Sequence, residues 1–229
     1  MSTIYNAPYP SNINFFNTNT NQTHTPTVLF DLMGFPRDEA ALNEIGVYRI
    51  EYHYPECDKY TEHFVPDGDI VFDKKAKKYT QPFKVEALDA ETVANIVQQL
   101  RDKLIPQIDE ATSTAIMAGF DYAINNETLH FSYDEFDQGN FTDAAVACSV
   151  PGAPTSITWN GYRNYDGYAK GELVRLTLTA AEFLPLYNAA LQHKASKMED
   201  GGSKKAQVNS ATTAAALLAL AAEWGLNIE

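Results

Sequence analysis

The most regular pattern of apolar and polar positions begins at Asp89, after which apolar residues recur every three or four positions. The stripe comprises Val93, Ile96, Val97, Leu100, Leu104 and Ile108. This spacing lies on one face of a helix, and an aspartate is a favourable cap for the first turn. The pattern predicts a long amphipathic helix over residues 88–118, which Pro106 should kink or end near Ile105 because proline lacks a backbone donor.

The apolar stripe has two interpretations. A helix with one narrow apolar face packs either on the rest of its own chain or along copies of itself in a short coiled coil. If the stripe is a seam between copies, we expect a homo-oligomer, and a trimer is among the forms that such a seam allows. The stripe is too brief to separate the two interpretations.

Residues 28–87, ahead of this helix, have the pattern of a small β-rich α+β domain. β-Branched and aromatic residues alternate over much of residues 47–54, as in a half-buried strand. Asp67-Gly68-Asp69 and the basic run at residues 74–78 are turn signals between further short strands. A short helix is expected between Phe35 and Gly46, since Pro36 suits its first turn.

Residues 1–27 are rich in Asn, Thr, Ser and Pro and carry no Asp, Glu, Lys or Arg. Such residues compete with the backbone for hydrogen bonds and disfavour a helix. The segment is either a flexible terminus or an extended arm that orders against a neighbouring subunit. In the second case the aromatic residues are the expected anchors on that neighbour: Tyr5, Tyr9, Phe15 and Phe16.

Residues 119–229 mix strand and helix patterns. A hairpin turn is expected at Asn125-Asn126, and Thr179-Ala180-Ala181-Glu182 is a capping box that begins a helix. Gly201-Gly202-Ser203 is expected to be a hinge and Ser210 to cap the last helix. Strands are predicted at residues 129–133, 156–159 and 173–178, and a further short helix at residues 141–149.

The chain is therefore predicted to be α+β. We expect an extended N-terminal arm, a small β-rich domain, a long linking helix and a compact C-terminal α+β module. Their expected bounds are residues 1–27, 28–87, 88–118 and 119–229.

Composition narrows the classes of partner. The 229-residue chain carries 30 Asp and Glu against 17 Lys and Arg, a formal charge of −13. Nucleic acid is bound by basic faces, and an acidic protein is also repelled by anionic lipid. We therefore expect neither nucleic acid nor a membrane as a partner. The most apolar window, residues 211–222, is shorter than the roughly 20 residues that span a bilayer. Cys57 and Cys148 cannot form a disulfide framework and fit a reducing compartment.

The charge is unevenly distributed. Residues 104–162 contain no Lys or Arg but eight Asp and Glu. Either this is a solvated acidic face, or it complements a basic partner, with Asp134, Glu135 and Asp137 as the expected contact. The Gly- and Tyr-rich loop at residues 160–171 is either a mobile surface loop or a recognition loop. Its candidate contact residues are Tyr162, Tyr165 and Tyr168.

No motif for catalysis or cofactor binding is present: the sequence lacks a nucleophile elbow, a phosphate loop, a dinucleotide fingerprint and a zincin motif. His53, Cys57 and His63 are close in sequence, but structural zinc takes four ligands in tight pairs. We therefore expect no catalytic residues, no metal and no cofactor.

The C-terminal half resembles a domain of uncharacterised function that is common in tail proteins of bacteriophages and prophages. Within its middle motif, Asp134 precedes a Gln-x-Asn segment formed by Gln138 and Asn140. This sequence departs from that pattern at Asp137, where the family more often has serine, and in its long loop at residues 160–171. The segments that carry the resemblance are residues 119–122, 136–141, 157–159 and 176–183. Including the outline of the first half, the resemblance covers about residues 35–225.

The resemblance implies a structural protein of a bacteriophage tail, at the baseplate or at a tail-fibre attachment. It would bind other tail or fibre proteins through its N-terminal arm, and would be found in the virion tail and, during assembly, in the host cytoplasm. A tail-fibre assembly chaperone is the alternative. An enzyme acting on host surface polysaccharide is a third hypothesis, which rests only on scattered carboxylates.

Overall fold

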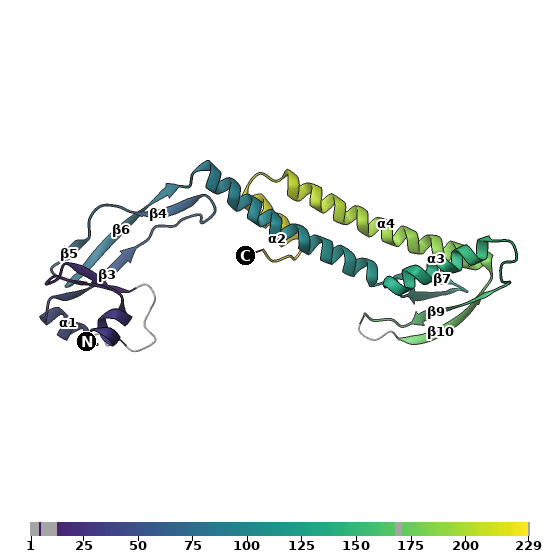
Figure 1. The fold of residues 1–229 in the computed structure, drawn as a ribbon, viewed down its shortest axis with the longest axis horizontal. Coiled ribbons are helices and arrows are strands. Elements are labelled where there is room, and N and C mark those ends of the chain that lie inside the picture. The colour runs from purple at the N-terminus through teal and green to yellow at the C-terminus, as the bar shows by residue number, and fades with distance from the viewer. Residues whose placement is uncertain (1–4, 6–12, 168–170, 229) are drawn as a thin grey trace. The chain divides into compact units, whose positions relative to one another are not determined.

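The computed structural model describes residue 5, residues 13–167 and residues 171–228 (Figure 1). Its chain divides into two compact units, residues 1–94 and 95–229. Helices and strands occur together in both, so the fold class is α+β, as the sequence predicts. Each unit is described by itself below.

The first unit is built on a six-stranded sheet. The strand order is β2-β1-β3-β6-β4, and β5 also pairs with β6. The pairing of β3 with β6 is parallel and every other described pairing in this sheet is antiparallel. The strands are β1 (Asn14–Asn17), β2 (Gln22–His24), β3 (Val47–His53), β4 (Glu62–Pro66), β5 (Val71–Asp73) and β6 (Lys78–Ala87).

Two short helical segments accompany this sheet: η1 (Thr27–Leu32), a stretch of π-helix, and α1 (Glu39–Glu44). The Asp38 side chain caps α1 by accepting a hydrogen bond from the Ala41 backbone N–H at 3.0 Å. Leu29 and Phe30 of η1 and Leu42 of α1 are buried together with aromatic residues from the first 15 positions. The short helix expected between Phe35 and Gly46 is therefore present.

The described part of residues 1–27 does not form the expected extended arm. Tyr5 and Phe15 are buried in the core of the first unit, with ring centroids 5.1 Å apart. Burial raises the pKa of Tyr5 to about 12. Neither side chain is accessible as an anchor on a neighbouring protein, so that prediction is wrong for these two residues. Phe16 is half-buried beside Tyr79, with ring centroids 4.8 Å apart, and Tyr9 lies outside the described residues.

The polar residues of the expected arm form a hairpin turn instead. The Thr18 backbone N–H donates to the Gly46 carbonyl at 2.9 Å, and the Asn19 side chain donates to the Ile45 carbonyl at 2.8 Å. Asn21 has a φ of +56°, which asparagine tolerates well in turns. Asn and Thr thus disfavour a helix, as expected, but the side-chain hydrogen bonds of Thr18 and Asn19 join the turn between β1 and β2 to the residues just before β3.

The second unit contains α4 (Ala180–Ser210), α5 (Ala214–Glu223) and, from Asn95 onward, α2 (Ala90–Met117). The Asp89 side chain accepts from the Thr92 backbone N–H at 2.8 Å, as expected of the capping residue. The helix continues through Pro106 to Met117, within the predicted bounds of 88–118, so of the two effects expected of Pro106 an end near Ile105 is wrong. Thr213, rather than Ser210, caps α5 by accepting from the Ala216 backbone N–H.

The apolar stripe of α2 is covered within the chain. Val97, Leu100, Leu104 and Ile108 are all at most 5% exposed. On either side of the stripe, α2 is hydrogen-bonded to the C-terminal segment, since its Arg101, Lys103 and Gln107 side chains donate to the carbonyls of Ala211, Ile228 and Asn227. A seam between copies is therefore wrong for the four buried residues. Val93 and Ile96, near the start of α2, are half-buried.

Figure 1 shows α4 running alongside α2. Gly201 of α4 lies close to Thr112 of α2. A Cβ atom at Gly201 would lie 2.3 Å from Thr112 Oγ1 on α2. The Lys205 ammonium and the Asp109 carboxylate, 2.6 Å apart, join the same two helices. The expected hinge at Gly201-Gly202-Ser203 is wrong, because these residues continue the helix and the glycine allows close contact between helices.

A four-stranded antiparallel sheet completes the second unit, in the order β10-β9-β8-β7. Asn125 and Asn126 have φ of +52° and +63°, so the predicted hairpin turn is confirmed. The capping box is also confirmed, since the Thr179 backbone N–H donates to the Glu182 carboxylate at 2.9 Å. The elements are β7 (Phe120–Ile124), β8 (Glu127–Phe131), α3 (Glu135–Ser149), β9 (Ile157–Arg163) and β10 (Glu172–Leu178).

The core of this part lies between the sheet, α3 and α4. Phe131 of β8, Phe141 of α3 and Phe183 of α4 are completely buried there. Among the described residues, no helix combines the length and the apolar character needed to cross a membrane.

Candidate functional site

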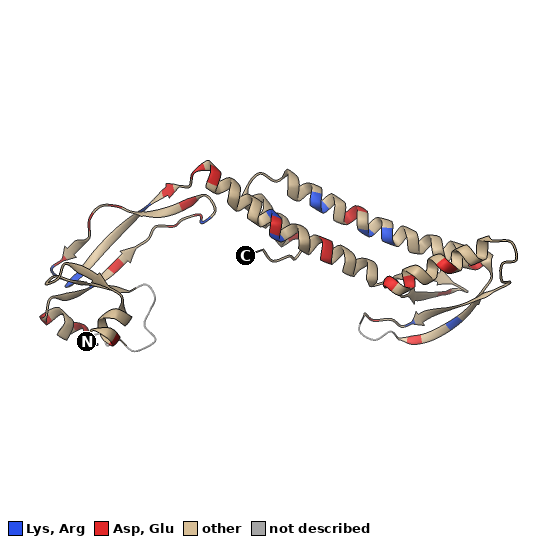
Figure 2. Ribbon diagram, viewed as in Figure 1, with Lys and Arg blue, Asp and Glu red and all other residues tan. Residues whose placement is uncertain are grey.

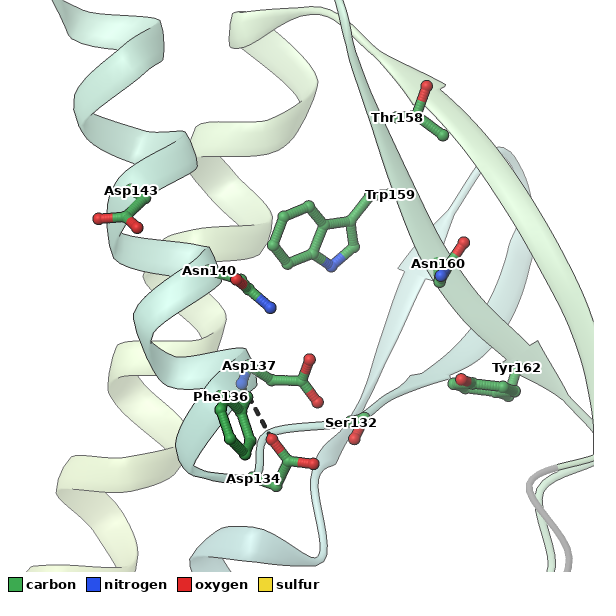
Figure 3. Close-up of a pocket in the computed structure, with 10 residues that line it drawn as sticks. All are labelled: Ser132, Asp134, Phe136, Asp137, Asn140, Asp143, Thr158, Trp159, Asn160 and Tyr162. Atoms are coloured by element: carbon green, nitrogen blue, oxygen red, sulfur yellow. Dashed lines mark hydrogen bonds between the residues drawn. The ribbon is translucent and has the colours of Figure 1, made fainter.

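A cavity of about 410 Å³ lies between α3 and β9 in the second unit (Figure 3). This volume is within the range of about 300–1,000 Å³ common for ligand pockets. Its walls combine carboxylates, amides and hydroxyls with three aromatic rings. They are formed by Ser132, Asp134, Phe136, Asp137, Asn140, Asp143, Thr158, Trp159, Asn160 and Tyr162.

The start of α3 forms one wall. Asp134 caps the helix by accepting from the Asp137 backbone N–H at 2.9 Å, a typical role for aspartate at this position. The preceding Tyr133 is buried and fixes the chain at this corner. From the first turns of the helix, the side chains of Asp137 and Asn140 point into the space that faces Trp159 (Figure 3).

β9 forms the opposite wall. Trp159 is held by the core, since its ring centroid lies 4.5 Å from that of Phe141 and 5.0 Å from that of Phe183. The indole is half-buried and also lines the cavity. Phe136, at the start of α3, is 85% exposed. The cavity therefore has a fixed aromatic surface inside it and a free aromatic ring among its lining residues.

A smaller cavity of about 180 Å³ continues the site, because it shares Ser132, Asp134 and Tyr162 with the larger one. The rings of His130 and Tyr165 line it and are stacked, with centroids 3.7 Å apart and planes within 1° of parallel. Two acceptors hold the imidazole: its Nδ1 lies 2.8 Å from Asp121 Oδ1, and its Nε2 lies 2.9 Å from the Ala118 carbonyl oxygen.

The charge of the larger cavity is negative. Three carboxylates line it, from Asp134, Asp137 and Asp143, and its described lining contains no Lys or Arg. Among the described residues, no ion pair involves these carboxylates. Figure 2 shows acidic residues on α3 and basic residues on α4. Of the basic residues, Lys194 donates to the Gln138 side chain at 2.7 Å.

Other carboxylates of the acidic segment are paired with cations outside it. Asp109 binds Lys205 at 2.6 Å. Glu127 forms a two-point contact with Arg163, and this hydrogen bonding lowers the pKa of the Glu127 carboxyl below its usual range. Ion pairs thus neutralise part of the negative charge of the segment outside the cavity, whereas the carboxylates that line the cavity keep theirs.

The structure brings several predicted site residues together. Asp134, Asp137 and Tyr162 line the larger cavity and Tyr165 lines the smaller one. Glu135 is exposed on α3 and lines neither, and Tyr168 lies outside the described residues.

Sequence reasoning did not assign a site role to the remaining lining residues. Asn140 and Trp159 belong to motifs that carry the family resemblance, which was the available signal for them. Thr158 lies in the same segment as Trp159 and shared that signal. Asn160 gave no signal, because its position depends on the path of the neighbouring strand.

The described residues contain no group of three or more His, Cys, Asp or Glu side chains arranged to hold a metal ion. The lining groups of the larger cavity can accept hydrogen bonds, attract a cation and cover an apolar surface. These are the properties of a binding site for a basic and partly apolar ligand.

A family model described as a domain of unknown function (DUF4376) matches residues 99–222, which is more than half of the 229-residue chain. Every lining residue of both cavities lies inside the matched segment. Comparison with curated proteins and with solved structures gives no match.

Proposed function

The chain belongs to the DUF4376 family, and from that premise we propose that it is a structural component of a bacteriophage tail, at the baseplate or at a tail-fibre attachment. The observation that carries the proposal is the cavity between α3 and β9. Asp134 and Asn140 come from the middle motif of the resemblance to phage tail proteins and Trp159 from its tryptophan strand, and all three line this cavity.

Gln138, the remaining residue of the middle motif, supports the cavity from behind. Its side chain donates to the Tyr133 carbonyl at 3.2 Å and accepts from Lys194 at 2.7 Å. It thereby ties the capped start of α3 to α4. Asp134, the cap of α3, and Asn140 thus line the cavity, and Gln138 holds this wall in place.

The cavity replaces the N-terminal arm as the proposed contact with neighbouring tail proteins, because Tyr5 and Phe15 are buried. An acidic surface around an aromatic ring favours a partner that carries basic side chains, and charge complementarity speeds docking. We place the protein in the virion tail, and in the host cytoplasm during assembly. A homo-oligomer remains part of the proposal, through a surface other than the buried part of the α2 stripe.

Quantitative mass spectrometry of purified particles tests the proposal. A structural component is present at a fixed ratio to the other tail proteins. Absence from purified particles contradicts the proposal, and recovery with unfinished fibres from the same lysate would support the assembly-chaperone alternative.

The contribution of the cavity is tested by two matched variants in the first turn of α3. Asp137→Asn removes a carboxylate that lines the cavity, and Glu135→Gln removes one that does not. We expect Asp137→Asn to lower the amount of the protein in particles and Glu135→Gln to leave it unchanged. Equal incorporation of both variants would exclude the cavity as the contact.

A further inference from the structure

One edge of β9 is unpaired over most of its length. β10 pairs with β9 at every position from Ile157 to Arg163, whereas β8 pairs with it only at Tyr162, opposite His130. β8 ends at Phe131, after which the chain turns toward the cap of α3. Among the described residues, no strand therefore pairs with residues 157–161 of β9 on the side of β8.

This unpaired edge borders the larger cavity. Thr158, Trp159 and Asn160 are consecutive, and all three line the cavity. Successive side chains of a strand point to opposite faces of its sheet, so a cavity against one face would be lined by alternate residues. Lining by three consecutive residues indicates that the cavity meets the strand along its edge.

An unpaired strand edge presents backbone N–H and C=O groups that pair readily with another strand. Natural proteins usually cover such an edge or protect it with charge. Here an open cavity lies along it. Addition of an extended peptide to a free edge is a recurrent mode of recognition, in which the backbone supplies affinity and side-chain contacts supply specificity.

The wall opposite this edge selects charge. Asp137 and Asp143 lie on α3, six residues apart, which corresponds to about 9 Å along a helix. Side chains on one face of a strand repeat at about 7 Å. A basic side chain of an added strand would meet this wall, and the Asp137 carboxylate, which points into the cavity, is its expected contact (Figure 3). A peptide with acidic residues facing this wall would be repelled.

Aromatic groups in the same cavity suit long basic side chains. The Trp159 indole offers a surface for the methylene stem of Lys or Arg, and an aromatic face also attracts the cationic head. Phe136, with 85% of its area exposed, offers a further apolar contact.

We infer that the cavity accepts an extended basic segment of a neighbouring protein, which pairs with the free edge of β9 and directs alternate Lys or Arg side chains toward α3. The inference rests on the proposed function in taking the occupant to be a protein. It adds the chemistry of that occupant and its mode of binding.

Tryptophan fluorescence of the full chain tests the inference. Trp224 is replaced by Phe so that the emission reports on Trp159. The probe is a synthetic hexapeptide, acetyl-Thr-Lys-Val-Lys-Thr-Lys-amide. We expect a saturable change in emission at peptide concentrations up to about 1 mM. A change of the same size with a neutral oligosaccharide but not with the peptide would overturn the inference, as would no change with the peptide.

Two matched peptides separate backbone pairing from charge. Methylation of alternate backbone nitrogens keeps the charge but removes the donors needed for strand pairing, and should weaken binding about tenfold. Replacing each Lys with Glu should abolish binding. Equal binding of the methylated peptide would refute strand addition, and binding of the Glu peptide would refute the role of α3.

Variants of the protein complete the test. Asp137→Asn should weaken binding of the Lys peptide several-fold, while Glu135→Gln should bind as the unchanged chain does, with circular dichroism confirming that both are folded. Equal affinities for the two variants would overturn the assignment of the acidic wall. The outcome is separate from that of the proposed function, because peptide binding needs no virion and detection in particles needs no peptide.

Discussion

Gly201 shows how one residue decides the contact between two helices. A Cβ atom at this position would lie 2.3 Å from Thr112 Oγ1, and also within 3.2 Å of the Thr112 Cβ atom. Thr112 cannot rotate freely away, because its hydroxyl donates to the Ile108 carbonyl at 2.7 Å. A Cβ atom at the next residue, Gly202, would have no neighbouring atom within 4 Å. Of these adjacent glycines, Gly201 therefore has no room for a side chain, whereas Gly202 has.

Alanine substitution of the two glycines should change stability in opposite directions. Gly201→Ala forces α2 and α4 apart and should lower the free energy of unfolding by about 1–3 kcal/mol. Gly202→Ala removes backbone freedom from the unfolded chain and should raise it by about 0.5–1 kcal/mol. Chemical denaturation measures both, and a loss of stability in both variants would contradict the assigned contact.

The Glu182 carboxylate predicts how stability depends on pH. It accepts hydrogen bonds from the Thr179 backbone N–H and hydroxyl, which lowers its pKa below the ordinary 4.5. A carboxyl whose pKa is lower in the folded state stabilises the fold above its unfolded pKa, and this stabilisation is lost as the pH falls through the folded value.

We therefore expect the thermal midpoint to fall below about pH 4.5 and the fall to be shallower in Glu182→Gln. Glu199→Gln removes an exposed carboxylate from the same helix without touching the cap, and is the matched control. Identical pH profiles for Glu182→Gln and the unchanged chain would show that the cap does not contribute in this way.

At the scale of elements, α2 shows which features of a helix its apolar periodicity predicts and which it does not. The spacing of its apolar residues and the cap at Asp89 give the start and the buried face of the helix, because both depend on residues close in sequence. The surface that covers this face comes from more than 100 positions later, as the hydrogen bond between Arg101 and the Ala211 carbonyl shows. Local pattern carries no information about that contact.

Truncating the stripe tests this arrangement. Leu104 is completely buried, so Leu104→Ala should lower the free energy of unfolding by about 2–5 kcal/mol without changing the molecular mass in solution. Gln99→Ala, on the exposed side of the same helix, should change stability little. Light scattering that shows dissociation of an oligomer by Leu104→Ala would instead favour a seam between copies.

Contacts between residues distant in sequence also explain why the first strands and part of the site were not predicted. Residues 14–17 lie among Asn and Thr, so their composition favours an arm, yet Phe15 is buried because β1 pairs with β3 more than 30 positions away. At the cavity, Asp134, Asp137 and Tyr162 could be proposed from charge and loop composition. Asn160 could not, because its exposure depends on where β8 stops pairing with β9.

At the scale of the whole molecule, the charge of −13 is organised rather than uniform. Asp109 and Glu127 are paired with Lys205 and Arg163 in the second unit. The carboxylates that line the larger cavity have a different environment, since no ion pair involves them among the described residues and that of Asp137 points into the cavity (Figure 3). A binding surface for a basic neighbour explains this difference in terms of charge complementarity.

The division of the chain into two units also predicts independent folding. The boundary lies between Ala94 and Asn95, inside α2. A fragment of residues 88–229 keeps the Asp89 cap and the whole of the second unit, so it should unfold in one cooperative transition by circular dichroism. Absence of a transition would show that the second unit depends on the first.

Cross-linking mass spectrometry of purified particles tests the central claim most directly. Lys194 is the natural reporter, because its ammonium contacts Gln138 on the helix that forms one wall of the cavity. The account predicts that the chain is present in particles and that Lys194 is cross-linked to a basic segment of another tail protein. Absence of the chain from particles, or cross-links from Lys194 only to its own chain, would contradict it.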